Sequence, residues 1–520
     1  MVFVLVFSIH LSAQDNSNSD DTVFVIREIE FDVSGRSKPQ FLMIHGEFEE
    51  GERIRGQENF DSYIALRIQL LNNQRVLDQS FTRIDYSLGE QEADGDVPVK
   101  LRVYVKDSNN FIILPYPEYS SSDGLSITME LKDYNFFGTM STFSLDLGYH
   151  LDTQDVSSYR FSFDMNLPFN AAGFLWNLYV ENNFEYTNNE PLFYRSVTGI
   201  SVQVPWYSSL FSIGINQYLT FNDEWSTEAH DIYRDFAKNP EKYLDPFGST
   251  EFFVDWHLPL GVEIGSFGML VYNFHSGFMI NYPLGDMDPT RKPVTTFGNS
   301  LGFGRINWMG NLRKGLTVSF GVSNDLYFER QDAPHRISLE GIAVFHHPFT
   351  GFLGFSSIIR YQQWWQWSDL LGDHIPYYSA GEFIRGVPDD DLRANQMLSL
   401  SIDLPIKIIN FIPSVWFKKD QFRIFDCEVY FSPFVDLALL KGPLSQLKED
   451  PWEGINFSFK DIISTTGFEV IAFSHRYRSI SLRGSVGYNI GKMINEGLPS
   501  LILGFFPKWD EIYIGLSLAY

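Results

Sequence analysis

From residue 108 to the C-terminus the sequence alternates between apolar and polar residues, and no other feature constrains the fold as strongly. In residues 142–150 (TFSLDLGYH), large apolar side chains alternate with serine, aspartate, glycine and histidine. Residues 159–167 and 316–323 repeat the pattern. A period of two places successive side chains on opposite faces of a β-strand, so these segments predict strands with one apolar and one polar face.

The composition indicates that these strands cross a membrane as a barrel. The chain has 48 Phe, 26 Tyr and 11 Trp in 520 residues, and aromatic residues favour pleated sheets. The mean hydropathy is only -0.13, and no run of eighteen apolar residues could form a transmembrane helix. A transmembrane barrel reaches such an average because lipid-facing apolar residues alternate with polar residues that face the lumen.

Connection lengths separate a membrane barrel from a soluble sandwich, which also alternates. Short connections such as NFFGT, PFNAAG and PWYSS take turns with long polar ones at 223–248, 281–297 and 366–395. Short periplasmic turns and long outer loops are typical of outer-membrane barrels. Aromatic residues at one strand end fit an interfacial girdle, notably Trp364, Trp365 and Trp367.

We count about 16 to 18 strands, thirteen before the loop at 366–395 and five after it. An odd number before this loop places it outside the cell if the first strand runs outward from the periplasm. The predicted fold class is therefore mainly β: a transmembrane antiparallel β-barrel over 108–520, of about 16 strands with 18 as the upper count.

The N-terminus predicts export followed by a small domain. Residues 1–13 are apolar and end in a small residue, as a signal peptide does, although a basic first region is missing and a buried strand is the alternative. The polar residues 14–21 predict a linker. Residues 22–107 show the order β-α-α-β-β, with strands at 23–33, 81–88 and 97–107 and helical spacing at 38–44 and 60–73.

The loop at 366–395 contains GEFIRGVPDDDLRANQ, in which Ile384-Arg385-Gly386-Val387 resembles the [VIL]-R-G-[FYW] signature of the BamA/TamA assembly and translocation superfamily (bacterial surface antigen family). The resemblance implies that this tip folds back into the barrel lumen. Val387 departs from the pattern, which has an aromatic residue there. The strand at 428–440 resembles the superfamily's F-x-D-x-G strand through Phe434 and Asp436, with Ala438 in place of glycine.

These two motifs predict an ion pair. The alternation of residues 428–440 places Phe434 and Asp436 on the lumen side of their strand. A guanidinium that enters a confined lumen needs a fixed anion, and a carboxylate accepts two parallel hydrogen bonds from it. We therefore expect Arg385 to pair with Asp436. Asp403 lies on the polar side of the strand that follows the loop.

Three further matches extend the resemblance over residues 23–520. The N-terminal domain resembles a POTRA domain, the superfamily's periplasmic module, although a ferredoxin-like or other α+β domain has the same element order. Residues 110–138 resemble the first hairpin of the superfamily's barrels. The C-terminal residues YIGLSLAY resemble the barrel recognition signal G-x-x-hydrophobic-x-aromatic, through Gly515, Leu518 and Tyr520.

Several classes of function are disfavoured. A net charge of -26 argues against nucleic-acid binding, which depends on clustered Lys and Arg. The single Cys427 excludes an internal disulfide framework. We find no common nucleophile, zinc or phosphate-binding motif, and so predict no catalytic residue, metal or cofactor. His346 and His347 precede Pro348 in a predicted periplasmic turn and, as adjacent residues, form a poor metal pair.

The resemblance implies a non-enzymatic machine in the bacterial outer membrane, with its N-terminal domain in the periplasm. Its expected partners are outer-membrane lipid, and unfolded or secreted client polypeptides and periplasmic proteins that bind the POTRA-like domain. One such domain in residues 22–107 favours a specialised member. The alternatives are a passive porin-like channel or surface structural protein, and a soluble all-β enzyme or lectin.

Overall fold

The computed structural model divides the chain into two compact units, one that ends at Asp107 and one that begins at Ser108. The predicted signal peptide (1–13) and linker (14–21) lie outside the described residues. The residues that the structure describes are 22–92, 95–120, 124–151, 157–187, 193–221, 247–284, 293–327, 335–367, 378–379, 383–387, 393–441, 457–477, 480–490 and 511–518.

The first unit is a small α+β domain. Its elements are β1 (Val23–Ser34), α1 (Pro39–His45), β2 (Arg53–Arg55), α2 (Gln57–Asn73), β3 (Arg83–Leu88) and β4 (Asp96–Lys106). The strands form a sheet in the order β2-β1-β4-β3, in which β1 and β4 run parallel. The order matches the sequence prediction apart from the three-residue β2 between the helices.

Helix α2 forms the core of this domain because its apolar residues recur at helical spacing. Phe60, Tyr63, Leu70 and Leu71 are buried on one face of the helix. The Phe60 ring stacks on that of Phe24 in β1, with the ring centroids 4.7 Å apart. Both edge strands of the sheet, β2 and β3, pair on one side only within the part of the chain that the structure describes.

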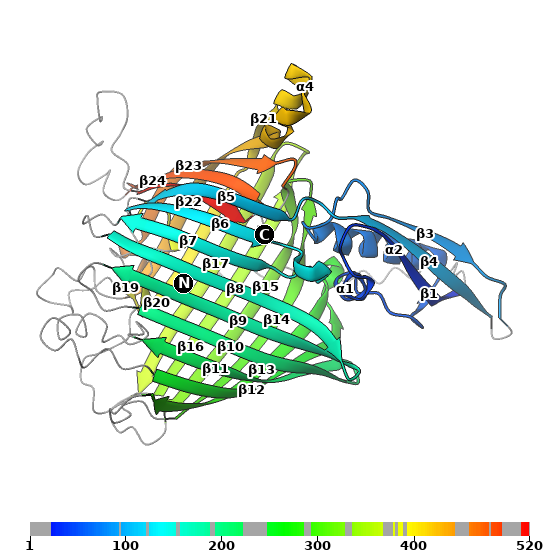
Figure 1. Cartoon of the computed structure of the whole chain (residues 1–520), viewed down its shortest axis with the longest axis horizontal. Coiled ribbons are helices and arrows are strands. Elements are labelled where there is room, and N and C mark those ends of the chain that lie inside the picture. Colours follow the sequence, from blue (N-terminus) through cyan, green and yellow to red (C-terminus); the bar gives the residue numbers. More distant parts are fainter. Residues whose placement is uncertain are drawn as a thin grey trace, which may run out of the picture. The chain divides into compact units, whose positions relative to one another are not determined.

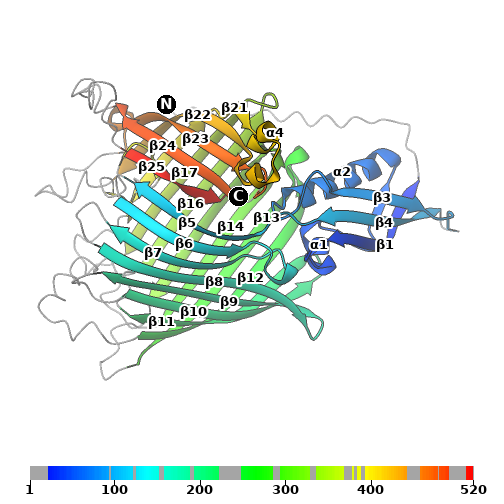
Figure 2. The same cartoon turned by 45° about the horizontal axis from the view of Figure 1, so that its top comes forward.

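The second unit is an antiparallel sheet that curls into a barrel (Figures 1 and 2). Its strands are β5 (Phe111–Ser120), β6 (Gly124–Asp133), β7 (Phe143–Leu151), β8 (Ser157–Ala171), β9 (Phe174–Thr187), β10 (Phe193–Trp206), β11 (Ser209–Phe221), β12 (Phe247–Glu263), β13 (Met269–Pro283), β14 (Val294–Met309), β15 (Leu312–Tyr327), β16 (His335–Pro348), β17 (Gly354–Trp367), β20 (Gln396–Asp403), β21 (Ile406–Phe411), β22 (Cys427–Lys441), β23 (Ile463–Ser474), β24 (Ile480–Asn489) and β25 (Glu511–Leu518).

Segments β20 and β21 form one strand with an interruption at Leu404 and Pro405, because both pair with β22 and the register of β20 continues into β21 as far as Lys407, where a bulge shifts it by one residue. Counted in this way, the described residues contain eighteen barrel strands, thirteen before the loop at 366–395 and five after it. The predicted fold class is confirmed, at the upper of the two strand counts. The odd number places this loop at the end of the barrel opposite to the one where β5 begins.

The two faces of the strands differ as the alternation predicts. Leu147 in β7, Phe252 in β12 and Phe320 in β15 are half exposed on the outer face, where lipid would cover them. Short turns connect the strands at the end where β5 begins, as between Ala171 and Phe174. The described part of the chain contains no helix that is both long and apolar enough to cross a membrane.

Two local predictions are wrong. Because adjacent strand residues point to opposite faces, Trp364 does not share a girdle with Trp365: Trp365 is exposed, whereas Trp364 packs against a buried cluster that contains Ile384. His346 and His347 lie in β16 and not in a turn, because the ladder with β17 continues to Pro348. His346 is buried and His347 is exposed.

The barrel closes through a short seam between its first and last strands. Within the residues that the structure describes, β25 pairs with β5 only at Tyr513–Ser120 and Ile514–Tyr119. On their other sides, β5 pairs with β6 over ten residue pairs and β25 with β24 over eight. Strand β5 also contains Pro115 and Pro117, and proline has no backbone N–H to donate to a neighbouring strand.

Candidate functional site

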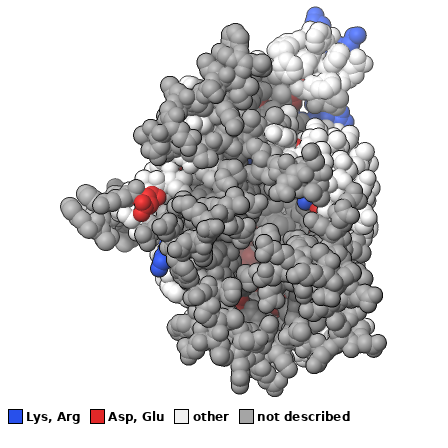
Figure 3. Space-filling model, turned by 90° about the vertical axis from the view of Figure 1, so that its left-hand side faces the viewer, with Lys and Arg blue, Asp and Glu red and all other residues white. Residues whose placement is uncertain are grey.

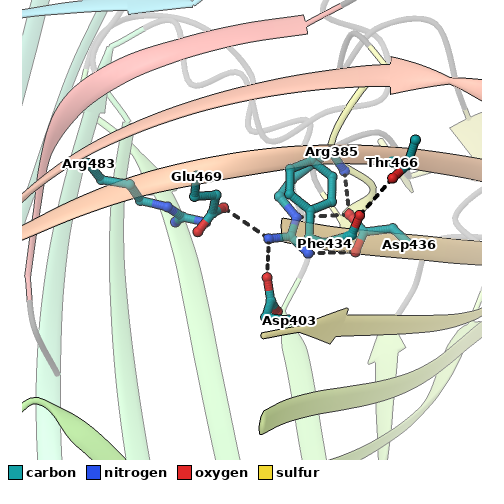
Figure 4. A network of polar contacts seen from close by, with 7 residues as sticks. All are labelled: Arg385, Asp403, Phe434, Asp436, Thr466, Glu469 and Arg483. Carbon is teal, nitrogen blue, oxygen red and sulfur yellow. Dashed lines mark hydrogen bonds and ion pairs between the residues drawn. The ribbon is translucent and has the colours of Figure 1, made fainter. Parts of the chain in front are cut away.

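The tip of the loop between β17 and β20, residues 383–387, lies inside the barrel against its wall (Figure 4). A two-residue ladder between β18 (Tyr378–Ser379) and β19 (Arg393–Ala394) joins the two arms of the loop. Ile384 is fully buried and Val387 is 4% exposed. The tip is therefore packed as a core segment is packed, although it belongs to a long connection.

Arg385 binds three carboxylates from three different strands. Its backbone N–H, Nε and Nη2 donate to the carboxylate of Asp436 in β22, at 3.0, 2.9 and 2.6 Å. Its Nη1 donates to Asp403 in β20 at 2.6 Å and to Glu469 in β23 at 2.9 Å. The planar guanidinium thus uses its bidentate edge on Asp436 and links three segments of the wall.

Two neighbouring side chains complete the network. The Phe434 ring lies against the guanidinium, with Cζ of Arg385 3.8 Å from the ring centroid, a distance at which a cation is attracted to an aromatic face. Arg483 in β24 donates to Glu469, so this carboxylate is shared by two guanidiniums. Asp436 and Glu469 are almost fully buried, which makes the loss of either guanidinium costly.

Glycines allow the tip to touch the wall through its backbone. Gly386 has a φ of +87°, and a Cβ built on it would lie 2.7 Å from the backbone nitrogen of Tyr488 in β24. A Cβ on Gly487 would lie 2.5 Å from the nitrogen of Gly386. Under the Phe434 ring, a Cβ on Gly467 in β23 would lie 2.6 Å from Cζ of that ring. A side chain at any of these positions would push the tip or the ring away.

Apolar side chains seal the tip beside the ion network. Ile384 and Val387 share a buried cluster with Ala438 of β22 and Met397 of β20. The two departures from the superfamily pattern, Val387 and Ala438, meet in this one cluster. The cluster thus contains one side chain smaller than the expected aromatic residue and one larger than the expected glycine.

The structure brings together six of the predicted site residues, including Gly386 and Val387 of the tip, and separates the C-terminal signal residues from them. Arg385, Asp436, Phe434 and the tip around Ile384 form one site. Gly515 and Leu518 lie in β25, where they pair with Arg483 and Ile480 of β24. Tyr520 lies outside the described residues.

Sequence reasoning missed Glu469, Arg483 and the glycines of β23 and β24. Glu469 is the one charged residue of β23, which is a signal that the sequence offered. Its partner depends on the register of β22 against β23, in which Asp436 lies opposite Thr465. No local pattern gives that register.

The charged side chains of the site bind one another. They are two arginines and three carboxylates, and Thr466 beside them donates its hydroxyl to the carbonyl of Phe434. In the part of the chain that the structure describes, no three His, Cys, Asp or Glu side chains are grouped to hold a metal ion. The arrangement is suited to holding a loop against a wall.

Comparisons with known proteins give similarities of fold. No family model and no curated protein matches the sequence. Among solved structures, CdiB from Acinetobacter baumannii is similar with a TM-score of 0.46 and 13% identity, over 95% of this chain and 73% of that one. BamA from Haemophilus ducreyi lacking POTRA domains 1-3 is similar with a TM-score of 0.39 and 12% identity, over 95% and 84%.

The FrpB iron transporter from Neisseria meningitidis is also similar, with a TM-score of 0.36 and 9% identity, over 84% of this chain and 87% of that one. Because every one of these TM-scores is below 0.5, the similarities do not identify the function of this chain.

Proposed function

We propose that this chain is an outer-membrane barrel of the BamA/TamA type, which inserts proteins into the membrane or moves them across it. Its N-terminal domain lies in the periplasm, and it works without catalysis. The observation that carries the proposal is the seam, in which two residue pairs join β5 to β25. Opening it costs few hydrogen bonds and exposes two strand edges.

The edge strands that an open seam exposes can form backbone hydrogen bonds with an incoming strand. Unpaired backbone N–H and C=O groups of an edge strand form a template for another strand. Strand β25 keeps its eight pairs with β24 when the seam opens. A client strand can therefore add to β25 and be released sideways into lipid as the barrel closes.

The loop tip supports this mechanism by its position. Gly386 lies against Gly487 of β24, the strand that carries β25. Arg385 joins β20, β22 and β23 through its three carboxylates. The tip thus braces the wall on the β25 side of the seam, so that β5 is the strand free to move away.

The N-terminal domain offers a second edge. Strand β3 pairs with β4 on one side, and Tyr86 and Leu88 on it are about half exposed. A POTRA-like domain would receive client segments at such an edge by β-augmentation. The apolar side chains would contact alternate residues of the added strand.

A passive porin-like channel is the second candidate function. The carboxylates on the polar face of the strands, such as Asp146 and Asp164, favour it because they suit a water-filled lumen. This alternative predicts constitutive conductance and no effect of the seam on other proteins.

A disulfide across the seam tests the proposal. Ser120 and Tyr513 lie directly opposite each other, so Ser120→Cys with Tyr513→Cys, in a Cys427→Ser background, can be joined by oxidation. The matched control joins Ser481→Cys to Ser517→Cys across the fully paired β24 and β25.

We expect the seam disulfide to deplete client barrels from the outer-membrane proteome, and reduction to restore them, while the control disulfide has no effect. An unchanged proteome with a fully oxidised seam would overturn the proposal. Loss of clients with both disulfides would overturn it too, because the seam would then have no special role.

A further inference from the structure

A short helical segment projects from the end of the barrel where β5 begins. It comprises α4 (Pro413–Phe417) and η6 (Asp420–Phe425) between β21 and β22, so we call residues 412–426 the β21–β22 segment. Figure 1 shows α4 beyond the end of β21. Most other connections at this end are tight turns, and the closing of a hairpin does not require fifteen residues.

The segment is ordered by its own polar contacts. The backbone N–H and the hydroxyl of Ser414 both donate to the carboxylate of Asp426, which ties the start of the segment to its end. Lys418 ends α4 in the left-handed conformation with φ 51°. The N–H of His475, in the neighbouring turn, donates to the carbonyl of Asp426 at 2.9 Å. The segment therefore has a defined shape.

This defined shape exposes its apolar side chains. Val415, Trp416, Phe417 and Phe425 are each between 54% and 62% exposed. A fold that buried its large apolar groups would not orient four of them outward within eleven residues. Lipid or another protein must therefore cover these four side chains.

The apolar surface continues the lipid-facing surface of the barrel. The Trp416 ring packs edge-on against the ring of Phe411, the last residue of β21, with the centroids 5.0 Å apart. Ile408 and Ile409 are exposed on β21 itself. Lys407 lies on the other face of β21, where it pairs with Glu428. The outer face of this strand thus runs without a break onto α4.

Basic side chains flank the apolar ones. The segment contains three cations, Lys418, Lys419 and Arg423. Its two anions are Asp420, which is exposed, and Asp426, which is buried and binds Ser414. In Figure 3 the projection at the top right is white with blue tips. The segment carries a net positive charge although the whole protein has a net charge of -26, so this local excess of cations suggests an anionic binding partner.

We propose that the β21–β22 segment is an interfacial anchor, which docks on the anionic headgroups of the leaflet at this end of the barrel. Trp416 and Phe417 enter the boundary between headgroups and acyl chains, and the three cations meet lipid phosphates. The anchor would fix the height and tilt of the wall at β21 and β22, which β23 and β24 separate from β25. Each cation at an anionic surface favours the docked state by about fivefold.

The test measures what surrounds Val415 in the full-length protein. Val415→Cys in a Cys427→Ser background carries a bimane label, and Trp416 stays in place. The protein is reconstituted in two kinds of vesicle, one of phosphatidylcholine alone and one that also contains about 30% phosphatidylglycerol. That share of anionic lipid gives the vesicle a strongly negative surface. Quenching by doxyl-labelled lipid is compared with quenching by aqueous iodide. The control is the same label at Glu50→Cys, which is exposed on the N-terminal domain.

We expect lipid quenching at residue 415 that the Glu50→Cys label does not show, and stronger quenching with phosphatidylglycerol. Lys418→Glu with Lys419→Glu should remove the phosphatidylglycerol effect. Because these two residues are at the surface, the barrel of this variant should stay folded. The control is that the unheated variant resists unfolding by detergent as the unchanged protein does. Iodide access equal to that at residue 50 would overturn the anchor. Protection from both quenchers would also overturn it, because a protein would then be the occupant.

Discussion

Arg385 donates to Asp436 from both its backbone and its side chain, with the backbone N–H at 3.0 Å and Nη2 at 2.6 Å from the two carboxylate oxygens. One carboxylate therefore fixes the conformation of the loop tip as well as the position of its charge. Asp436 lies in the middle of β22, so moving the tip leaves a buried anion without its partners.

We predict that Arg385→Ala destabilises the barrel by about 3–5 kcal/mol, the usual result when one partner of a buried ion pair is removed. Arg385→Lys keeps the charge but cannot span three carboxylates, and should recover only part of the loss. Urea unfolding in detergent, followed by tryptophan fluorescence, measures both. The control is Arg160→Ala, which breaks a half-exposed pair with Glu185 across two strands and should cost less than about 1 kcal/mol. Equal losses at 385 and 160 would remove the special role of the tip.

Asp436→Asn should cost more than Asp403→Asn. Asp436 accepts three hydrogen bonds from Arg385 and is 2% exposed, whereas Asp403 accepts one and is 17% exposed. An amide keeps the size of each side chain but removes its charge and one acceptor. A double-mutant cycle with Arg385→Ala should give a larger coupling energy for Asp436 than for Asp403. The reverse order would mean that the guanidinium is held mainly by β20.

Backbone contact between the tip and β24 predicts a steric effect without any change of charge. Gly487→Ala places a Cβ 2.5 Å from the nitrogen of Gly386, so the tip must move away. Val387 should then become accessible to a thiol reagent in a Val387→Cys, Cys427→Ser background. Gly351→Ala is the matched control, since a Cβ at this turn meets nothing within 4 Å. If labelling at 387 is unchanged by Gly487→Ala, the tip is not seated on β24 in solution.

The strand pattern was predictable because a membrane barrel imposes its period on every residue. The division into thirteen strands before the long loop and five after it follows from alternation and turn residues alone. His346 shows the limit of that method: a histidine pair before proline resembles a turn, but the ladder with β17 continues over it. Turn residues predict where a strand can end, and pairing decides where it does.

The site was predictable only in part, since a motif names residues and a register brings them together. Arg385 and Asp436 could be paired because each lies in a recognisable segment. Glu469 and Arg483 could not, because their places depend on how β22, β23 and β24 are aligned. The same holds for Gly487, whose function appears only when the loop tip lies on it.

The polar face of the first strands predicts cation selectivity for any current through the lumen. Glu130 lies opposite Asp146, and Asp164 lies opposite Glu181, so carboxylates on β6 to β9 adjoin one another. Their field attracts cations and repels anions within about 10 Å at 0.1 M salt. In planar bilayers under a KCl gradient, the reversal potential should show potassium preferred over chloride. Asp164→Asn with Glu181→Gln should reduce the preference, and higher salt should do the same by screening.

The control is Glu50→Gln, at an exposed position of the N-terminal domain, which should leave the preference unchanged. A preference for chloride would show that these carboxylates do not line the conducting path.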